Sequence, residues 1–322
     1  MTSKKQSLQD GALCLLLLLW ALGLFLYGQE IAAATASALE LCLFILLPSL
    51  FPFFVLSSLL ISSGIVTRLS SRLERPMRAL FNLPGTCAIP LLLGMIGGYP
   101  VGARTASDLY QQGLCSFEQA KRLLCFCNNA GPAFFISVIG AGFLHDAKLG
   151  VLLWLAHLLA AGVLSLFPLQ NGLSKQKEAA ITTIDAPASL LSAFLQAVTG
   201  AFSSFLNVCA FVLIFAVITR LSVTTSWFIR FCEALPGTAA FWQGIGVGIL
   251  ELTTGTSILS NAGLPRKLLL ASLSFLCGWG GISVQCQSVS LIRAAGLPCR
   301  PYLLAKLLQG VLAGALTLLL GI

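Results

Sequence analysis

The chain repeats part of its own sequence at long range. Residues 83–86 read Leu-Pro-Gly-Thr, and the same four residues return at 235–238, which is 235 − 83 = 152 positions later. The Ala-Gly pair at 161–162 returns at 313–314 with the same displacement. In a strongly apolar chain, a repeat of this length predicts a membrane protein of two related halves. Transporters are commonly built this way, with the solute site where the halves meet.

The composition fixes the class of protein. Hydrophobic residues make up 57% of the 322 and charged residues only 9%, which is too little charge for the surface of a soluble protein. A helix of roughly 20 residues crosses the hydrocarbon layer. Apolar runs that approach or reach this length occupy residues 12–27, 149–169, 205–218 and 302–322. We therefore expect an all-α, multi-pass protein of the cell membrane, with the lipid bilayer as its first partner.

Helix-breaking residues interrupt several of the apolar segments. They predict a re-entrant hairpin at about 84–103, a second at about 236–261, and broken crossings near 128–132 and 278–281. A broken helix exposes backbone groups, so it must be buried in protein or line a cavity. The expected hairpin and hinge positions are Pro48, Pro52, Gly97, Gly98, Pro100, Gly102, Gly131, Pro132, Gly255, Gly280 and Gly281.

These segments suggest four parts of the chain. Residues 1–30 form an N-terminal transmembrane helix or a signal-like segment, and the sequence leaves its cleavage open. Residues 31–169 form the first repeat, 170–188 a polar cytoplasmic linker, and 189–322 the second repeat. Each repeat is expected to have three crossings and one hairpin. Because three is odd, the second repeat should be inverted relative to the first.

The basic residues indicate an orientation. The expected topology places fourteen of the 19 Lys and Arg residues inside, including Arg104 and Lys306, and this predicts a cytoplasmic N-terminus. The formal net charge of +8 then reflects membrane orientation rather than nucleic-acid binding. A cluster of arginines after the second apolar segment should lie in the cytoplasm: Arg68, Arg72, Arg75 and Arg78.

Glu251 is the clearest ionisable residue at the expected membrane depth. It lies in the second hairpin, within Gly-Ile-Leu-Glu-Leu-Thr-Thr-Gly at 248–255. A carboxylate there is costly unless it pairs, binds a cation or receives a polar solute. Two interpretations stay open: a ligand of a solute or coupling ion, or a structural hydrogen-bond acceptor for the hairpin tip.

The other candidates lie at the first hairpin and at the two breaks. Tyr99 could stack on a planar ligand, and Arg104 is either an anion donor or a charge that fixes topology. Amides and an indole at the breaks suit a base or sugar edge, or alternatively bond neighbouring helices. The candidate solute-binding residues are Tyr99, Arg104, Asn128, Asn129, Glu251, Thr253, Thr254, Trp279 and Gln285.

Motifs of soluble enzymes are missing, so we expect no enzyme activity. The sequence has no Walker-type phosphate loop, no His-Glu-x-x-His and no Gly-x-Ser-x-Gly elbow. His145 and His157 are too different in setting to suggest a metal site, and no cofactor is expected. A coupling ion such as Na⁺ or H⁺, a small polar solute and a homo-oligomer are all compatible with the pattern.

Four motifs resemble one known family. They are Leu-Pro-Ser-Leu-Phe-Pro-Phe at 47–53, Gly-Gly-Tyr-Pro-Val-Gly-Ala at 97–103, Cys-Asn-Asn-Ala-Gly-Pro at 127–132, and the 248–255 stretch. Together they resemble the YlbJ sporulation integral membrane proteins, which carry the nucleoside recognition, or Gate, domain. The resemblance covers most of the chain. It implies a multi-pass protein of spore-forming bacteria with a transport or gating role and a nucleoside-like solute.

Two functional hypotheses follow. The first is a transporter or gated pore, in which both hairpin tips meet both broken helices at the midplane and one half rocks against the other. The second is a non-transporting membrane scaffold for envelope or spore assembly, with hairpins that serve as packing devices. Solid apolar packing of Leu, Phe and Ala between the hairpins would favour the scaffold.

Overall fold

A computed structural model describes residues 2–166 and 190–322, and within these residues every regular element is a helix. This agrees with the expected all-α class. The predicted linker at 170–188 lies outside the described residues. The first half contains α1 (Thr2–Leu26), α2 (Gly28–Leu41), η1 (Cys42–Leu46), α3 (Leu47–Ser62), α4 (Ile65–Phe81), η2 (Gly85–Cys87), α5 (Ala88–Ile96), α6 (Val101–Gln111), α7 (Phe117–Cys127), η3 (Phe134–Phe143) and α8 (Ala147–Leu166).

The second half follows the same order of elements. A long helix, a short amphipathic helix, a hairpin, a broken helix and a final long helix succeed one another. They are α9 (Leu190–Thr224), α10 (Ser226–Glu233), α11 (Ala239–Leu250), α12 (Leu252–Ser260), α13 (Arg266–Trp279), α14 (Gly281–Ala294) and α15 (Cys299–Leu319). The two Leu-Pro-Gly-Thr copies lie just before the hairpins α5–α6 and α11–α12, at equivalent places.

Five helices in the described part are long and apolar enough to cross a membrane. They are Gly28–Ser62, Ala147–Leu166, Leu191–Thr224, Arg266–Ala294 and Cys299–Leu319. Many of their leucine and phenylalanine side chains are exposed, as the hydrocarbon of a bilayer requires. The protein is therefore an integral membrane protein.

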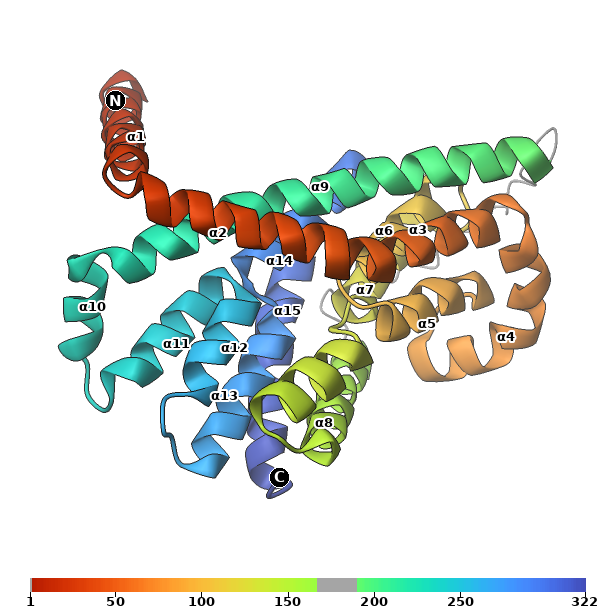
Figure 1. Ribbon diagram of the computed structural model, residues 1–322. Coiled ribbons are helices and arrows are strands. Elements are labelled where there is room, and N and C mark those ends of the chain that lie inside the picture. The colour runs from red at the N-terminus through yellow and green to blue at the C-terminus, as the bar shows by residue number, and fades with distance from the viewer. Residues whose placement is uncertain (1, 167–189) are drawn as a thin grey trace.

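The two longest helices lie side by side. The continuous helix α2–η1–α3 and helix α9 contact each other along much of their length and run in opposite directions (Figure 1). The predicted hinge positions Pro48 and Pro52 lie in this continuous helix, and a π-helical turn, η1, ends two residues before Pro48. A proline removes a backbone donor, and a π turn absorbs this loss without ending the helix.

Both predicted breaks are present in the structure. A capping box starts α7, because Oγ of Ser116 accepts from N of Gln119 at 3.3 Å and N of Ser116 donates to Oε1 of Gln119 at 2.7 Å. The helix ends at Cys127, where Asn128 turns into an extended conformation. In the second half, Gly280 separates α13 from α14 with a φ of 85° that favours glycine.

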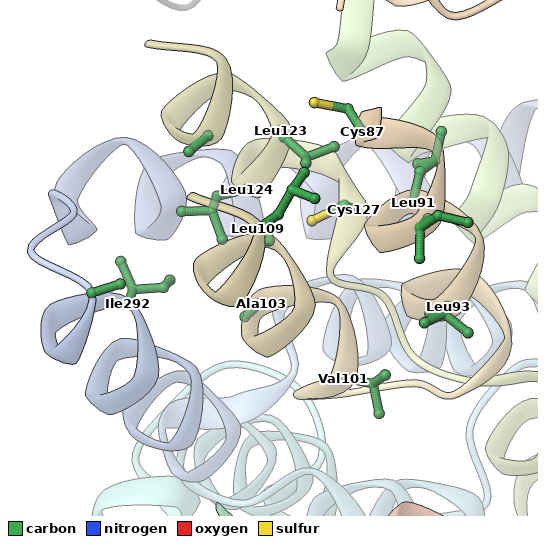
Figure 2. Packing of buried hydrophobic residues seen from close by; sticks show 14 of the residues in the cluster. Cys87, Leu91, Leu93, Val101, Ala103, Leu109, Leu123, Leu124, Cys127 and Ile292 are labelled. Atoms are coloured by element: carbon green, nitrogen blue, oxygen red, sulfur yellow. The ribbon is translucent and has the colours of Figure 1, made fainter. Parts of the chain in front are cut away.

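The first hairpin is longer than predicted and is packed inside the protein. Its second arm, α6, runs to Gln111, so that Arg104 lies in a helix rather than in a loop. Buried side chains of α5, α6 and α7 meet one another and Ile292 of α14 (Figure 2). A Cβ added at Gly102 would lie 2.3 Å from the carbonyl oxygen of Cys127, so this glycine permits close packing of α6 on the break.

Candidate functional site

The tip of the first hairpin reaches both broken helices. The hydroxyl of Tyr99 donates to the carbonyl oxygen of Cys277 at 3.0 Å, which lies just before the second break. Next to it, Gly98 contacts the first break, since a Cβ there would lie 3.0 Å from N of Gly131. The predicted meeting of this tip with the two breaks is therefore present in the structure.

The tip of the second hairpin lies on the second break. A Cβ added at Gly281 would lie 3.1 Å from N of Leu252, which is the residue after Glu251. The Glu251 carboxylate is the N-cap of α12 and accepts from N of Thr253 at 2.9 Å and from N of Thr254 at 2.7 Å. In this conformation Glu251 is a structural hydrogen-bond acceptor for the hairpin tip, which is one of the two interpretations that the sequence left open. A role as a ligand stays a prediction.

Asn128 ties the first break to three other elements. Its side-chain oxygen accepts from N of Ala103 in α6 at 3.1 Å. Its amide nitrogen donates to Oγ of Ser288 in α14 at 2.9 Å and to the hydroxyl of Tyr302 in α15 at 3.0 Å. Because both ends of the amide are used within the protein, Asn128 holds the break in place.

A lysine occupies the interior of the same break. Lys306 of α15 has 0% exposure, and its ammonium donates to the carbonyl oxygen of Asn128 at 2.6 Å and to Oε1 of Gln309. It also lies 4.9 Å from the centroid of the Tyr99 ring. The positive-inside pattern counted Lys306 among the cytoplasmic charges, and the side of the membrane stays a prediction, but the structure buries this side chain inside the protein.

Gln309 extends this network to the second asparagine and to a histidine. Its amide nitrogen donates to Oδ1 of Asn129 at 2.8 Å and lies 3.3 Å from Nε2 of His157. The same histidine nitrogen accepts from N of Ala130 at 3.3 Å, while its Nδ1 is buried without a partner among the described residues. All of these side chains are fully buried.

The second break presents an indole and an amide. Nε1 of Trp279 donates to the carbonyl oxygen of Ile249 at 3.1 Å, and Nε2 of Gln285 donates to the carbonyl oxygen of Trp279. The other end of that amide, Oε1 of Gln285, is buried and has no partner within residues 2–166 and 190–322. Gln285 thus holds a free acceptor at the second break.

Arg104 lies apart from this cluster. It is 5% exposed, and its guanidinium donates to Oγ of Ser58 at 3.0 Å, pairs with Asp108 at 3.5 Å and stacks on the Phe54 ring at 4.7 Å. The structure does not bring it to Glu251. A buried guanidinium that joins α3 to α6 stabilises the packing of the first half.

Sequence analysis missed three members of the network, Lys306, Gln309 and His157, as site residues. One feature could have revealed the first of them, because a lysine within an apolar span is a functional candidate by default. The three-residue spacing of Lys306 and Gln309 also places both on one helix face. The described residues contain no group of three or more His, Cys, Asp or Glu that could hold a metal ion.

Comparisons with known proteins agree with the architecture. The nucleoside recognition (Gate) family matches residues 43–224. The sporulation integral membrane protein YlbJ of Bacillus subtilis (strain 168) is 30% identical over 319 residues, which cover 91% of this chain and 78% of that protein. No solved structure matches this chain. The family match begins in η1 and ends with the last residue of α9, so it covers the first half from η1 onward and the first helix of the second half.

Proposed function

Since this chain belongs to the nucleoside recognition (Gate) family, we propose that it is a transporter or gated pore for a small polar solute, with a nucleoside as the first candidate. One observation carries the proposal most directly. Two hairpin tips and two helix breaks, drawn from both halves of the chain, meet around buried amides, an ammonium and aromatic rings. Midplane sites built from discontinuous helices are typical of secondary transporters.

The chemistry of this meeting place favours a polar solute over simple packing. Solid apolar packing between the hairpins would favour a scaffold, and buried polar groups are costly unless they are bonded. Here the interface contains Asn129, Lys306 and Gln309, all fully buried. Breaks in which hydrogen bonds join the halves can exchange those bonds for bonds to a solute when the halves part.

A nucleoside would fit the groups that are present. The indole of Trp279 offers a stacking face for a base, and the free Oε1 of Gln285 can accept from a base amino group. The amides of Asn128 and Asn129 would bond the sugar or the base edge once the break opens. This residue assignment is part of the proposal.

We also propose a cytoplasmic N-terminus and a role in sporulation. The four arginines of α4 are all exposed, and their position in the cytoplasm would place the N-terminus there too. The relative from Bacillus subtilis is named a sporulation protein, and we propose a role in sporulation for this chain as well. Deletion of the gene in its host should lower the yield of mature spores.

A thermal stabilisation screen of the purified protein tests the proposed function. The ligands are nucleosides, with amino acids and dicarboxylates as alternatives. We expect at least one nucleoside to raise the melting temperature of the wild type and not of Gln285→Leu. Asn261→Leu is the matched control, because this exposed amide bonds only its own helix, at Ser257, and should leave the ligand effect unchanged.

Each alternative outcome of the screen is informative. Stabilisation by amino acids or dicarboxylates alone would keep a transporter but reject a nucleoside. No stabilisation by any solute, together with no exchange of labelled solutes across proteoliposome membranes, would reject transport and favour the scaffold.

A further inference from the structure

Lys306 carries a buried amine without an acidic partner in the described part of the chain. The ion pairs found there involve Arg78, Arg104 and Lys121, and none involves Lys306. A charged side chain inside a membrane protein is costly and usually has a counter-charge.

The three groups that surround the amine are those that bind cations. The carbonyl oxygen of Asn128 stands just after the C-terminal end of α7, where the helix dipole is negative. Oε1 of Gln309 is a neutral acceptor, and the Tyr99 ring lies 4.9 Å away, within the range of a cation–π contact. The break is a cation site that the chain fills with its own ammonium.

The titratable neighbours of this amine are few and neutral at ordinary pH. Helix α7 contributes the thiols of Cys125 and Cys127, α8 contributes His157, and the first hairpin tip contributes the phenol of Tyr99. Beyond that ring lie Cys277 of α13 and Tyr302 of α15. None is a carboxylate. Because Nε2 of His157 accepts from a backbone N–H, the imidazole is neutral there. The positive charge in this region is therefore that of the protonated Lys306 amine.

The amine also joins parts that must separate if the halves move. Lys306 belongs to the second half, while its partners Asn128 and Tyr99 belong to the break and the hairpin tip of the first half. Loss of the proton removes the cation–π attraction and weakens the charge-assisted hydrogen bonds. A proton on Lys306 therefore strengthens a contact between the two halves.

We propose that Lys306 is the proton-coupling residue of this protein: the protonated amine closes the first break against the first hairpin tip, and release of the proton to water opens it. In this step one N–H bond of the ammonium breaks and one O–H bond of water forms, and no other bond changes. The inference rests on the proposed transport function and names H⁺ as the coupling ion.

The first experiment needs no solute. The tryptophan fluorescence of the purified protein is measured as a function of pH. Comparison with Trp279→Phe shows which part of the fluorescence change comes from the tryptophan at the second break. We expect a one-proton transition in the wild type that disappears in Lys306→Met and persists in Lys267→Met, a control at an exposed lysine of α13. We also expect the transition to persist in His157→Gln, which would show that it arises from the amine and not from the imidazole. A wild type without the transition, or a Lys306→Met variant that keeps it, would overturn the inference.

The second experiment separates coupling from transport. Proteoliposomes are tested for exchange of labelled for unlabelled uridine, adenosine and other solutes, and for accumulation driven by a pH gradient. We expect the wild type to do both. Lys306→Met should accumulate no more solute with the pH gradient than without it, whereas the control Lys267→Met should respond to the gradient like the wild type. Exchange in the wild type without any response to the gradient would refute proton coupling and leave the proposed function intact. No exchange of any solute would refute the proposed function, and the fluorescence titration would still decide the role of Lys306.

Lys306→Arg distinguishes proton exchange from a merely structural charge. An arginine keeps the charge and the hydrogen-bond donors but does not lose its proton in proteins. We expect this variant, once gel filtration shows that it is folded, to behave like Lys306→Met in the gradient assay. Wild-type coupling in Lys306→Arg would show that only the charge matters and would refute the proposal.

Discussion

The amide nitrogen of Gln309 lies 3.3 Å from Nε2 of His157, and these residues are 152 positions apart, which is the displacement of the Leu-Pro-Gly-Thr repeat. Equivalent positions of the two halves therefore touch each other, in α8 and α15. In an arrangement with twofold symmetry, a residue beside the axis contacts its own equivalent. This contact supports the pseudo-twofold that the repeat predicts, whereas the inverted orientation of the halves in the membrane stays a prediction.

Loss of the Gln309 side chain should destabilise the contact between the halves. In Gln309→Leu, the partners Asn129 and Lys306 each lose a buried hydrogen bond, and an unsatisfied buried group costs roughly 1–3 kcal/mol. We expect a clear fall in melting temperature, measured on the purified protein. In a double-mutant cycle with Asn129→Leu, the coupling energy should be on the order of 0.6–2 kcal/mol. Additive effects would show that this hydrogen bond contributes nothing.

Substitution of Glu251 should separate its charge from its capping role. Glu251→Ala removes the acceptor for the backbone N–H groups of Thr253 and Thr254, so we expect a loss of about 1 kcal/mol in stability. Glu251→Gln keeps an amide oxygen and should fold normally, yet abolish solute-induced stabilisation or uptake if the carboxylate binds solute or ion. Unchanged uptake in Glu251→Gln would leave the cap as the residue's role.

The second hairpin should tolerate no side chain at Gly255. A Cβ there would lie 2.1 Å from Cα and 2.3 Å from N of Gly248 on the facing helix α11, and both of these are backbone atoms that cannot turn aside as a flexible side chain can. We expect Gly255→Ala to prevent folding or to open the hairpin, seen as lost yield in gel filtration. Gly162→Ala is the control, because nothing lies within 4 Å of its Cβ and alanine favours a helix by up to about 1 kcal/mol.

Removal of one hydroxyl should loosen the first hairpin tip without altering the fold. Tyr99→Phe keeps the ring that faces Lys306 but loses the hydrogen bonds to the carbonyl oxygens of Cys277 and Gly278. We expect faster solute exchange in proteoliposomes and a stability loss of about 1 kcal/mol. An exchange rate equal to that of the wild type would mean that this hydrogen bond does not hold the tip on the second break.

The breaks and hairpins could be predicted from local sequence. Gly-Gly-Tyr-Pro at 97–100, Asn-Asn-Ala-Gly-Pro at 128–132 and Gly-Trp-Gly-Gly at 278–281 disfavour a continuous helix, so the ends of α5, α7 and α13 follow from a few neighbouring residues. The end of α6 could not be predicted in this way. Nothing near Arg104 stops the helix, and the turn comes only after Gln111.

The side chains of Lys306 and Arg104 show where sequence reasoning fails. The apolar span around Lys306 makes this lysine a functional candidate, but the span does not show in which direction the side chain points. Its direction depends on what packs against α15, namely the Asn128 carbonyl and the Tyr99 ring, which come from positions far along the chain.

The sequence alone determined the class of the protein, the two-part order of its elements and the places where helices break, because apolar length and local backbone restrictions are properties of short segments. Only the tertiary structure decided which polar groups meet: Asn128, Lys306, Gln309 and His157. Their meeting requires that the α7 break, α8 and α15 pack together, and such long-range packing leaves no trace in local sequence.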